Sequence, residues 1–172
     1  MASLTAQQII ERLNLVPLEG EGGYYRRVYL DEHKVATAEL GPYKSPVLPL
    51  TSVIYYLMTP ASISSLHYLA GLEVWTWIAG DPVEQVLAFS SGAVEVRRIG
   101  VDALSQPVSV VPGDCYQGSR LIKGGEHGYA LCSTVMSPAY SQSDFRLADI
   151  AVCERFPRYA AYLKEFLAEE VM

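Results

Sequence analysis

His67 and Glu73 are the two side chains best suited to chemistry in the segment SSLHYLAGLEVWTWIAG, which spans residues 64–80. The other residues of this segment are mostly apolar, so a polar side chain buried among them needs a partner. Histidine changes its charge near neutral pH, and a neighbouring carboxylate can orient it or share its proton. Imidazole and carboxylate are also good ligands for first-row transition metals. The pair therefore predicts acid–base catalysis, metal binding, or a buried pair that satisfies itself inside a core.

Strand alternation and a short turn bring these residues towards one interior. Successive side chains of a strand point to opposite faces, so Glu73, Trp75 and Trp77 share one face of their strand. A turn at Ala70–Gly71 can place that face opposite His67 on the preceding strand. A small barrel with inward-pointing side chains is where a ligand cavity forms.

The composition is that of one folded domain and argues against several classes of function. The chain has 172 residues, 50% of them hydrophobic, and its 13 basic and 19 acidic residues give a net charge of −6. This balance argues against nucleic-acid binding, which needs clustered Lys and Arg. The start of the chain lacks the pattern of a signal peptide, and no apolar run reaches the ~20 residues of a membrane span. We therefore expect a single cytoplasmic domain over residues 1–172 that binds neither nucleic acid nor membranes.

Short helices are expected at both ends of the chain. Residues 5–13 predict an amphipathic helix, in which Thr5 and Gln8 can form a capping box. Residues 157–170 carry large apolar side chains at helical spacing and predict a C-terminal helix.

The middle of the chain predicts an antiparallel β sandwich or barrel over about residues 20–149. Residues 31–50 are charged and then rich in Pro and Gly, which is typical of a long connection. Short runs of β type, separated by turn signals, then follow one another without helices between them. These runs are 51–58, 63–69, 72–79, 83–89, 93–99, 107–111, 115–120 and 128–136.

His67, Glu73 and Gly80 also stand where a known motif has them, and through them the chain resembles the cupin superfamily. The first cupin motif reads His-x-His-x-x-x-Glu and continues to a Gly. Leu69 occupies the position of its second histidine. The second motif, Pro-x-Gly-x-x-His, is similar to VVPGDCYQGS, in which Gln117 stands where the histidine belongs.

Further segments resemble one branch, the cupin family numbered five. Its Glu-Gly-Gly-Tyr segment is similar to Glu21–Tyr24, and the Val-Pro and aromatic-Gln of its second motif are similar to Val111–Pro112 and Tyr116–Gln117. Its closing residues are similar to Pro138, Tyr140, Asp144 and Phe145. The resemblance covers roughly residues 10–165.

The resemblance implies an all-β fold, a cupin-type double-stranded β-helix (jelly roll) flanked by short helices. It also implies a homodimer, because cupins generally pair two barrels and so cover their sheet edges. The segment YYRRVYL, residues 24–30, is the candidate strand for that contact. Its Arg26 and Arg27 leave two alternatives open, namely one anion-binding side chain for the cavity or surface charges only.

Three functional hypotheses follow, and the first uses a metal. Cupin enzymes typically hold iron, manganese, nickel or zinc with three His and one Glu. The equivalent ligands of a divalent transition metal here are His67, Glu73 and Gln117. Because Leu69 replaces an imidazole and an amide carries no charge, this donor set is weak.

The second hypothesis, which we favour, needs no cofactor. The chain binds a small polar or carbohydrate-like molecule, and His67 acts as general acid or base beside Glu73, as a histidine does in the metal-free sugar-nucleotide epimerases of the superfamily. Gln117 binds the molecule through its amide. Aromatic walls come from Tyr24, Tyr56, Trp75, Trp77 and Tyr116. In the third hypothesis the barrel is structural or only binds, and His67 and Glu73 satisfy each other.

Overall fold

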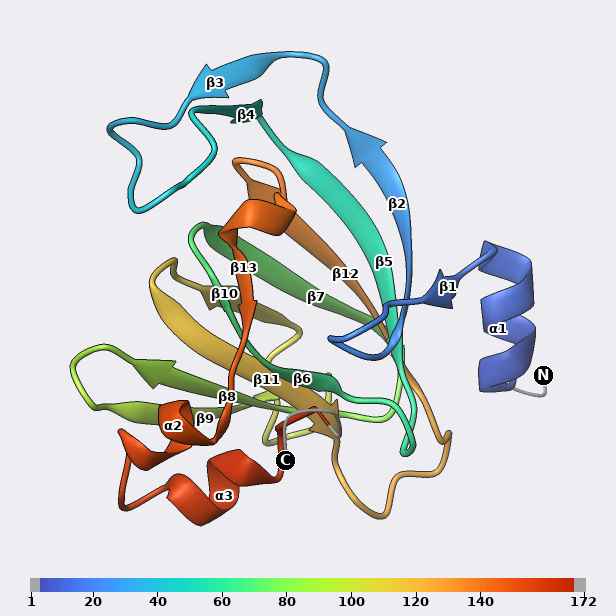
Figure 1. The fold of residues 1–172 in the computed structure, drawn as a ribbon. Coiled ribbons are helices and arrows are strands. Elements are labelled where there is room, and N and C mark those ends of the chain that lie inside the picture. Colours follow the sequence, from blue (N-terminus) through green and yellow to red (C-terminus); the bar gives the residue numbers. More distant parts are fainter. Residues whose placement is uncertain (1–3, 169–172) are drawn as a thin grey trace.

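Residues 4–168 are described by a computed structural model, in which two antiparallel sheets face each other and form a barrel (Figure 1). In spatial order the six-stranded sheet contains β1 (Val16–Pro17), β2 (Tyr24–Leu30), β5 (Ser52–Met58), β12 (Ala130–Ser137), β7 (Leu72–Gly80) and β10 (Val108–Val111). The five-stranded sheet contains β13 (Phe145–Leu147), β6 (Ser64–Leu69), β11 (Cys115–Leu121), β8 (Val83–Phe89) and β9 (Val94–Ile99). The predicted all-β fold is confirmed.

The predicted β runs from residue 51 onward all correspond to strands. Their pattern of apolar residues and turn signals is local, which explains the agreement. The region 31–50 differs from the prediction, because it contains a hairpin of β3 (Lys34–Ala36) and β4 (Val47–Pro49). Strands of three residues are too short to show a clear alternation, so the sequence pattern did not reveal them.

The apolar core fills one end of the barrel. Tyr56 and Met58 from β5 pack there against Val83 and Leu87 from β8, and all four side chains are buried. Across the six-stranded sheet, the pairing places Met58 beside Ala130 at this end. Towards the start of β5, the side chains that point into the barrel are more polar, and they surround a cavity.

The N-terminal helix α1 (Ala6–Leu13) confirms the predicted helix and its capping box. The Thr5 hydroxyl accepts from the backbone N–H of Gln8, and the Gln8 side chain accepts from the backbone N–H of Thr5. Ile9 is buried against Leu57 and Leu131, which point outward from the six-stranded sheet. The helix therefore packs on the outside of the barrel.

The C-terminal region contains two short helices, α2 (Ile150–Glu154) and α3 (Ala160–Lys164), where the sequence predicted one helix over 157–170. Pro157 lies in the turns that separate the two helices. In these turns the backbone N–H of Phe156 donates to the carbonyl oxygen of Cys153, and that of Tyr159 donates to the carbonyl oxygen of Phe156. The predicted residues 169–170 lie outside the described part of the chain.

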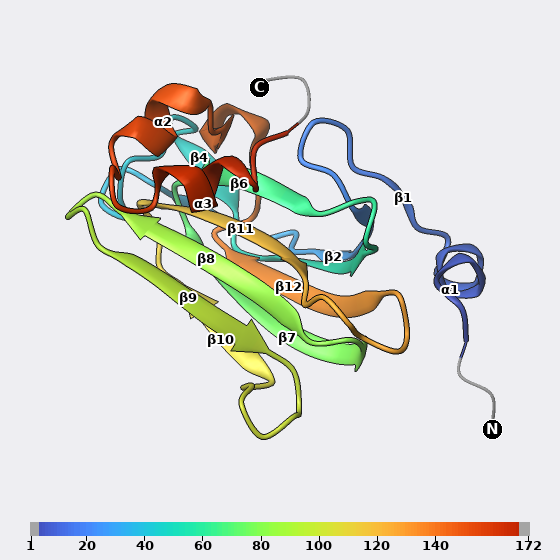
Figure 2. The same cartoon turned by 90° about the horizontal axis from the view of Figure 1, so that it is seen from below.

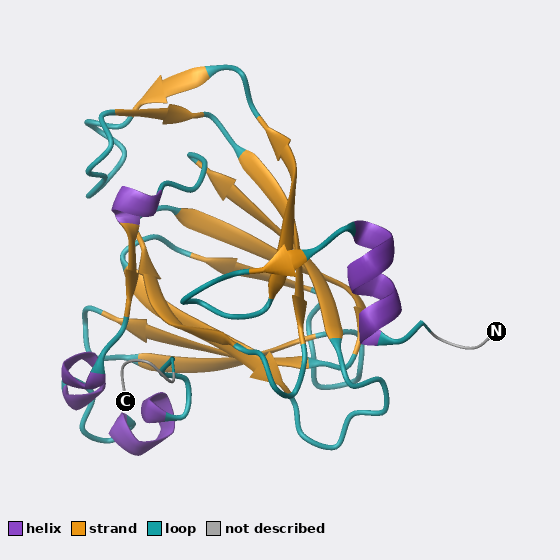
Figure 3. Ribbon diagram, turned by 45° about the vertical axis from the view of Figure 1, so that its right-hand side comes forward, coloured by secondary structure: helices purple, strands orange, loops and turns teal. Residues whose placement is uncertain are grey.

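The helices lie on the outer surfaces of the two sheets (Figure 3). Figure 2 shows α2 and α3 over the five-stranded sheet, where Leu163 and Phe166 are buried against Leu66 and Val86. A 3-10 turn, η1 (Gln142–Asp144), leads into β13. None of the helices between residues 4 and 168 has the length and apolar character of a membrane span.

Candidate functional site

A cavity of about 220 Å³ lies between the two sheets. Ile54, Leu69 and Trp75 form part of its apolar wall, and His67 and Glu73 are among its polar groups. Most of its lining comes from the inner face of the six-stranded sheet. It combines an apolar surface with a few convergent polar groups, which is typical of a ligand site.

His67 and Glu73 reach this cavity from facing sheets. His67 lies on β6 of the five-stranded sheet and Glu73 on β7 of the six-stranded sheet. The chain crosses from one sheet to the other at residues 70–71, so alternation on each strand directs both side chains to the same interior. The structure thus brings together the two residues that the sequence singled out.

The imidazole of His67 is held in one orientation. Its Nδ1 lies 2.8 Å from the backbone carbonyl oxygen of Ser65, and its ring stacks on Phe145 with the ring centres 5.4 Å apart. A carbonyl oxygen only accepts hydrogen bonds, so Nδ1 carries a proton. The second nitrogen, Nε2, is then the atom that can accept or release a proton. This fixed tautomer is the arrangement that a general base requires.

Glu73 is buried and is held by an amide. The Nε2 of Gln117 donates to Oε2 of Glu73 over 2.6 Å, and only 6% of Glu73 is exposed. Burial raises the pKa of Glu73 above its ordinary value, and the nearby His67 opposes that rise. Burial therefore favours the protonated carboxyl, which can donate a proton or a hydrogen bond.

Gln117 does not line the cavity, although the sequence predicted it as a ligand-binding side chain. Its amide N–H bonds Glu73, and its Oε1 accepts no hydrogen bond from any residue between 4 and 168. The register of β11 places Gln117 beside His67 of β6, and its amide reaches Glu73 of the other sheet, so Gln117 positions Glu73.

Glu21 is an ionisable group of the cavity that the sequence analysis gave no role, beside His67, Glu73 and Arg27. Its Oε1 accepts from the Ser64 hydroxyl over 2.9 Å and lies 3.9 Å from Nδ1 of His67. Glu21 belongs to the Glu-Gly-Gly-Tyr segment, which supplied a resemblance but no role. Since residue 21 lies far from residue 67 in sequence, only the fold reveals that they meet.

A glycine-rich loop over residues 18–23 holds Glu21 in place. Gly22 and Gly23 both have positive φ, at 97° and 71°. The Tyr56 hydroxyl donates to the carbonyl oxygen of Gly22 over 2.7 Å. The backbone N–H of Ser65 donates to the carbonyl oxygen of Glu21 over 2.8 Å. A Cβ at Gly23 would lie 2.6 Å from the Tyr56 hydroxyl oxygen, so the close approach requires glycine.

Two of the predicted aromatic walls line the cavity and three do not. Tyr56 and Trp75 line it, and their rings make an edge-to-face contact at 5.4 Å. Trp77 packs against the apolar core, with its Nε1 donating to the Asp81 carbonyl oxygen. Tyr24 and Tyr116 face the outside of the barrel.

Alternation explains the two outward tyrosines. Tyr24 packs beside α1 because its neighbour Tyr25 points inward and lines the cavity. Tyr116 lies beside Tyr68 on the outer face, 5.7 Å between ring centres, because Gln117 points inward. Tyr25 is therefore the wall residue that the sequence interpretation missed by one position.

The donor set does not fit the metal site of the first hypothesis. No group of three or more His, Cys, Asp and Glu side chains among residues 4–168 is arranged to hold a metal ion. Leu69 presents hydrocarbon to the cavity where a second imidazole would be needed. Gln117 directs amide hydrogens, which repel a cation, towards Glu73.

The cysteines are also unsuited to catalysis. Cys115, Cys132 and Cys153 are buried and free. Burial raises the pKa of Cys115 to about 11 and that of Cys132 to about 12, so both remain thiols at neutral pH. The acid–base groups of the cavity are the remaining candidates for chemistry.

Comparison with known proteins identifies similar sequences and folds. The Cupin_5 family model, described as "Cupin superfamily (DUF985)", matches residues 7–148. A hypothetical protein from Leishmania major is 30% identical, with a TM-score of 0.85 over 96% of this chain and 100% of its own. A protein from Shewanella oneidensis is 26% identical, with a TM-score of 0.82 over 96% of this chain and 99% of its own.

More distant structures share the fold alone. A cupin 2 conserved barrel domain protein from Rhodopseudomonas palustris is 12% identical, with a TM-score of 0.56 over 89% of this chain and 88% of its own. These matches confirm the cupin-type barrel that the sequence predicted. No curated protein matches the chain.

We predict that Gly23→Ala disturbs the loop that holds Glu21, whereas Gly92→Ala does not. Gly92 also has positive φ, but a Cβ there would meet no atom within 4 Å. Both variants carry the left-handed strain of roughly 1–2 kcal/mol, and only Gly23→Ala adds the clash with Tyr56. Urea unfolding should therefore show a larger loss for Gly23→Ala. Equal losses for the two variants would contradict the tight packing of this loop.

A second prediction concerns the pH dependence of stability. Because burial raises the native pKa of Glu73 above 4.5, its contribution to stability is complete below about pH 4.5 and declines as pH rises through the native pKa. Glu73→Gln removes this decline. The free energy of unfolding of Glu73→Gln should improve relative to wild type as the pH rises above about 4.5.

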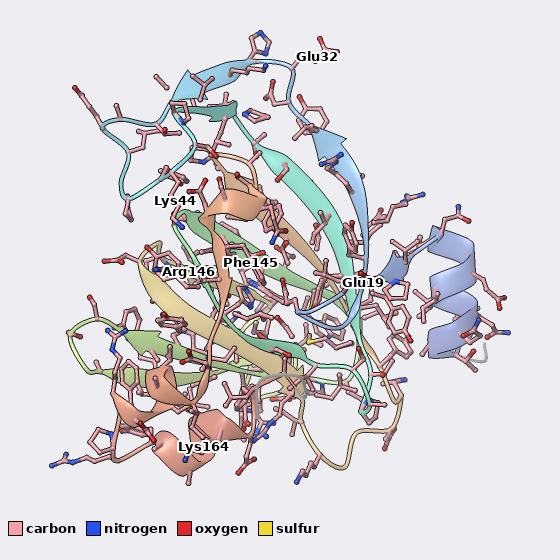
Figure 4. The ribbon with its side chains drawn as sticks, in the orientation of Figure 1. Glu19, Glu32, Lys44, Phe145, Arg146 and Lys164 are labelled. Carbon is pink, nitrogen blue, oxygen red and sulfur yellow. The ribbon has the colours of Figure 1, made fainter. Side chains whose placement is uncertain are left out.

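Urea titrations at several pH values measure this difference. Glu32→Gln serves as the control, because Glu32 is exposed far from the barrel interior (Figure 4). The difference in the free energy of unfolding between wild type and Glu73→Gln could instead stay constant with pH. That result would show that Glu73 ionises as freely in the native protein as in the unfolded chain.

Proposed function

Because the chain belongs to the Cupin_5 family of the cupin superfamily, described as DUF985, we propose that it binds a small polar, carbohydrate-like molecule in its barrel cavity and acts on it by proton transfer without a metal. The observation that carries this proposal is the fixed tautomer of His67. Its Nδ1 donates to the Ser65 carbonyl, so Nε2 is left to exchange a proton with a ligand.

The neighbouring carboxyl groups support an isomerase or epimerase type of reaction. Glu21 lies 3.9 Å from Nδ1 of His67, where a carboxylate stabilises the imidazolium that forms when Nε2 takes a proton. Glu73 lies on the facing sheet, and burial favours its protonated form. A ligand in the cavity then meets both a base and an acid, as a proton shift requires.

The hydrogen bonds of the pair argue against the purely structural hypothesis. His67 directs Nδ1 to the Ser65 carbonyl, and Glu73 receives its bond from Gln117. A pair that existed only to satisfy itself would bond directly across the interior. The bonding found here orients each side chain separately, which suits two groups that act on a third molecule.

We expect His67→Asn to abolish ligand binding or turnover without unfolding the barrel. Asparagine can keep an N–H for the Ser65 carbonyl while removing Nε2, so it preserves the structural hydrogen bond. A panel of sugars and small acids is screened for thermal stabilisation of wild type and variant. His127→Asn is the matched control, since His127 is exposed in a loop.

The hit from wild type should also stabilise His127→Asn and fail to stabilise His67→Asn. Retained stabilisation of His67→Asn would contradict the proposed role of Nε2. Metal analysis of the same samples tests the alternative with His67, Glu73 and Gln117 as ligands. Close to one equivalent of a transition metal in wild type, lost in His67→Asn, would favour that alternative.

We also propose a homodimer through the edge of β2. Strand β1 pairs only with Tyr24 and Tyr25, so the rest of β2 has no neighbour on that side among the described residues. Val28 and Tyr29 are 47% and 48% exposed there. An antiparallel contact across a two-fold axis lets this strand pair with its own copy, which covers the open edge.

The double variant Val28→Lys/Tyr29→Lys should change the light-scattering mass from that of two chains to that of one, because like charges would face each other across the two-fold axis. Circular dichroism should remain that of wild type. Wild-type protein that is monomeric at micromolar concentration would contradict the dimer.

A further inference from the structure

We infer that the cavity takes a small hydroxy acid whose carboxylate pairs with Arg27. This inference rests on the proposed function, because it assigns the ligand class of the same cavity. Arg27 lines the cavity and is exposed, so its guanidinium lies on the solvent side of the site. Among residues 4–168, it is the one basic side chain of that lining apart from His67.

Arg27 has no partner of its own within the described part of the chain. The ion pairs of arginine involve Arg97, Arg98 and Arg120, and the side-chain hydrogen bonds of arginine involve the same three residues. A guanidinium at a cavity that bonds no protein group keeps all five N–H donors for a ligand. A planar carboxylate can accept two of them in parallel.

The strand register places Arg27 on the inner wall and its neighbour on the outer wall. Arg27 pairs with Ile54, which pairs in turn with Thr134, and Thr134 pairs with Trp75. All four residues line the same cavity. Arg26 points the other way, with its guanidinium carbon 5.7 Å from the centre of the Tyr55 ring.

The row that contains Glu73 runs beside the row of Arg27. Ser52 pairs with Met136, and Met136 pairs with Glu73, two residues further along each strand. Adjacent rows on one face of a sheet are about 7 Å apart along the strands. Arg27 and Glu73 are also three strands apart, on β2 and β7, so the ligand extends along the inner face of the sheet from Arg27 towards the proton-transfer residues.

The charges of the cavity favour an acid. Glu21 accepts a hydrogen bond from the Ser64 hydroxyl, and burial favours the neutral form of Glu73. Among the residues described, the guanidinium of Arg27 is the positive charge of the lining, and it forms no ion pair there. A neutral sugar would leave the guanidinium of Arg27 without an ion pair, whereas the carboxylate of a sugar acid would form one with it.

Gln142, held by Tyr140, adds amide donors at the same cavity. The Tyr140 hydroxyl donates to Oε1 of Gln142 over 2.7 Å, which leaves the amide N–H groups of Gln142 for a ligand. Burial raises the pKa of Tyr140 to about 12, so its hydroxyl stays protonated at neutral pH. An amide and a guanidinium on one cavity suit oxygen-rich anions.

Three probes of matched shape test the inference by calorimetry and thermal stabilisation, namely D-glucuronate, D-glucose and D-glucose 6-phosphate. Wild type should bind glucuronate more tightly than glucose. Arg27→Gln should weaken glucuronate at least about tenfold and leave glucose unchanged, because it removes charged hydrogen bonds to the carboxylate alone.

Two arginine variants serve as controls. Arg26→Gln changes the adjacent residue on the outer face and should bind glucuronate like wild type. Arg146 lies on the other side of β13 from Phe145, stacked on Tyr68 at 4.2 Å (Figure 4). Arg146→Gln should also leave binding unchanged, which excludes a general effect of surface charge.

The outcomes separate this inference from the proposed function. Glucuronate and glucose could bind equally, with binding unaffected by Arg27→Gln and lost in His67→Asn. That result would overturn the assignment of an acid as the ligand and retain the proposed function. Glucose 6-phosphate could bind more tightly than glucuronate, with the same dependence on Arg27. That result would show that Arg27 binds a phosphate and would overturn the assignment of a hydroxy acid. Failure of wild type to bind any of the three at millimolar concentration would overturn the inference.

Discussion

A polar side chain inside an apolar barrel needs a hydrogen-bond partner, and this requirement shapes the whole interior. His67 bonds the Ser65 carbonyl, Glu73 bonds the Gln117 amide, and Glu21 bonds the Ser64 hydroxyl. All three partners belong to strands of the five-stranded sheet. That sheet therefore sets the tautomer of the imidazole and the orientation of both carboxyl groups before any ligand enters. Such preorganisation is the main contribution that a rigid barrel makes to a site.

The two departures from the metal-binding cupin motifs act together. Leu69 replaces an imidazole with hydrocarbon, and Gln117 replaces another with an amide that donates to Glu73. The first adds hydrocarbon to the cavity wall, and less polar surroundings raise the pKa of a carboxyl group. The second satisfies that carboxyl group without adding charge. A histidine and a buried acid on facing walls are the result.

Much of the fold could be predicted from the sequence, because alternation and capping are local properties. The Thr5 cap and the β runs after residue 51 belong to this class. Alternation also implied that Tyr116 faces away from Gln117, a consequence that the sequence interpretation did not apply. The place of Glu21 beside His67 could not be predicted, because it depends on a loop that crosses to a distant strand. The C-terminal helix was predicted too long, since helical spacing does not reveal the turns around Pro157.

The position of β12 has a consequence for how the protein is made. This strand lies between β5 and β7 in the six-stranded sheet, although it follows both of them in the chain. During synthesis, the facing edges of β5 and β7 have no partner until residues 130–137 leave the ribosome. Pairing between such distant segments is slow, and unpaired edges attract other chains. The last strand of this sheet to be synthesised therefore completes the wall of the cavity. Its pairing also ends the period in which the nascent chain is most prone to aggregate.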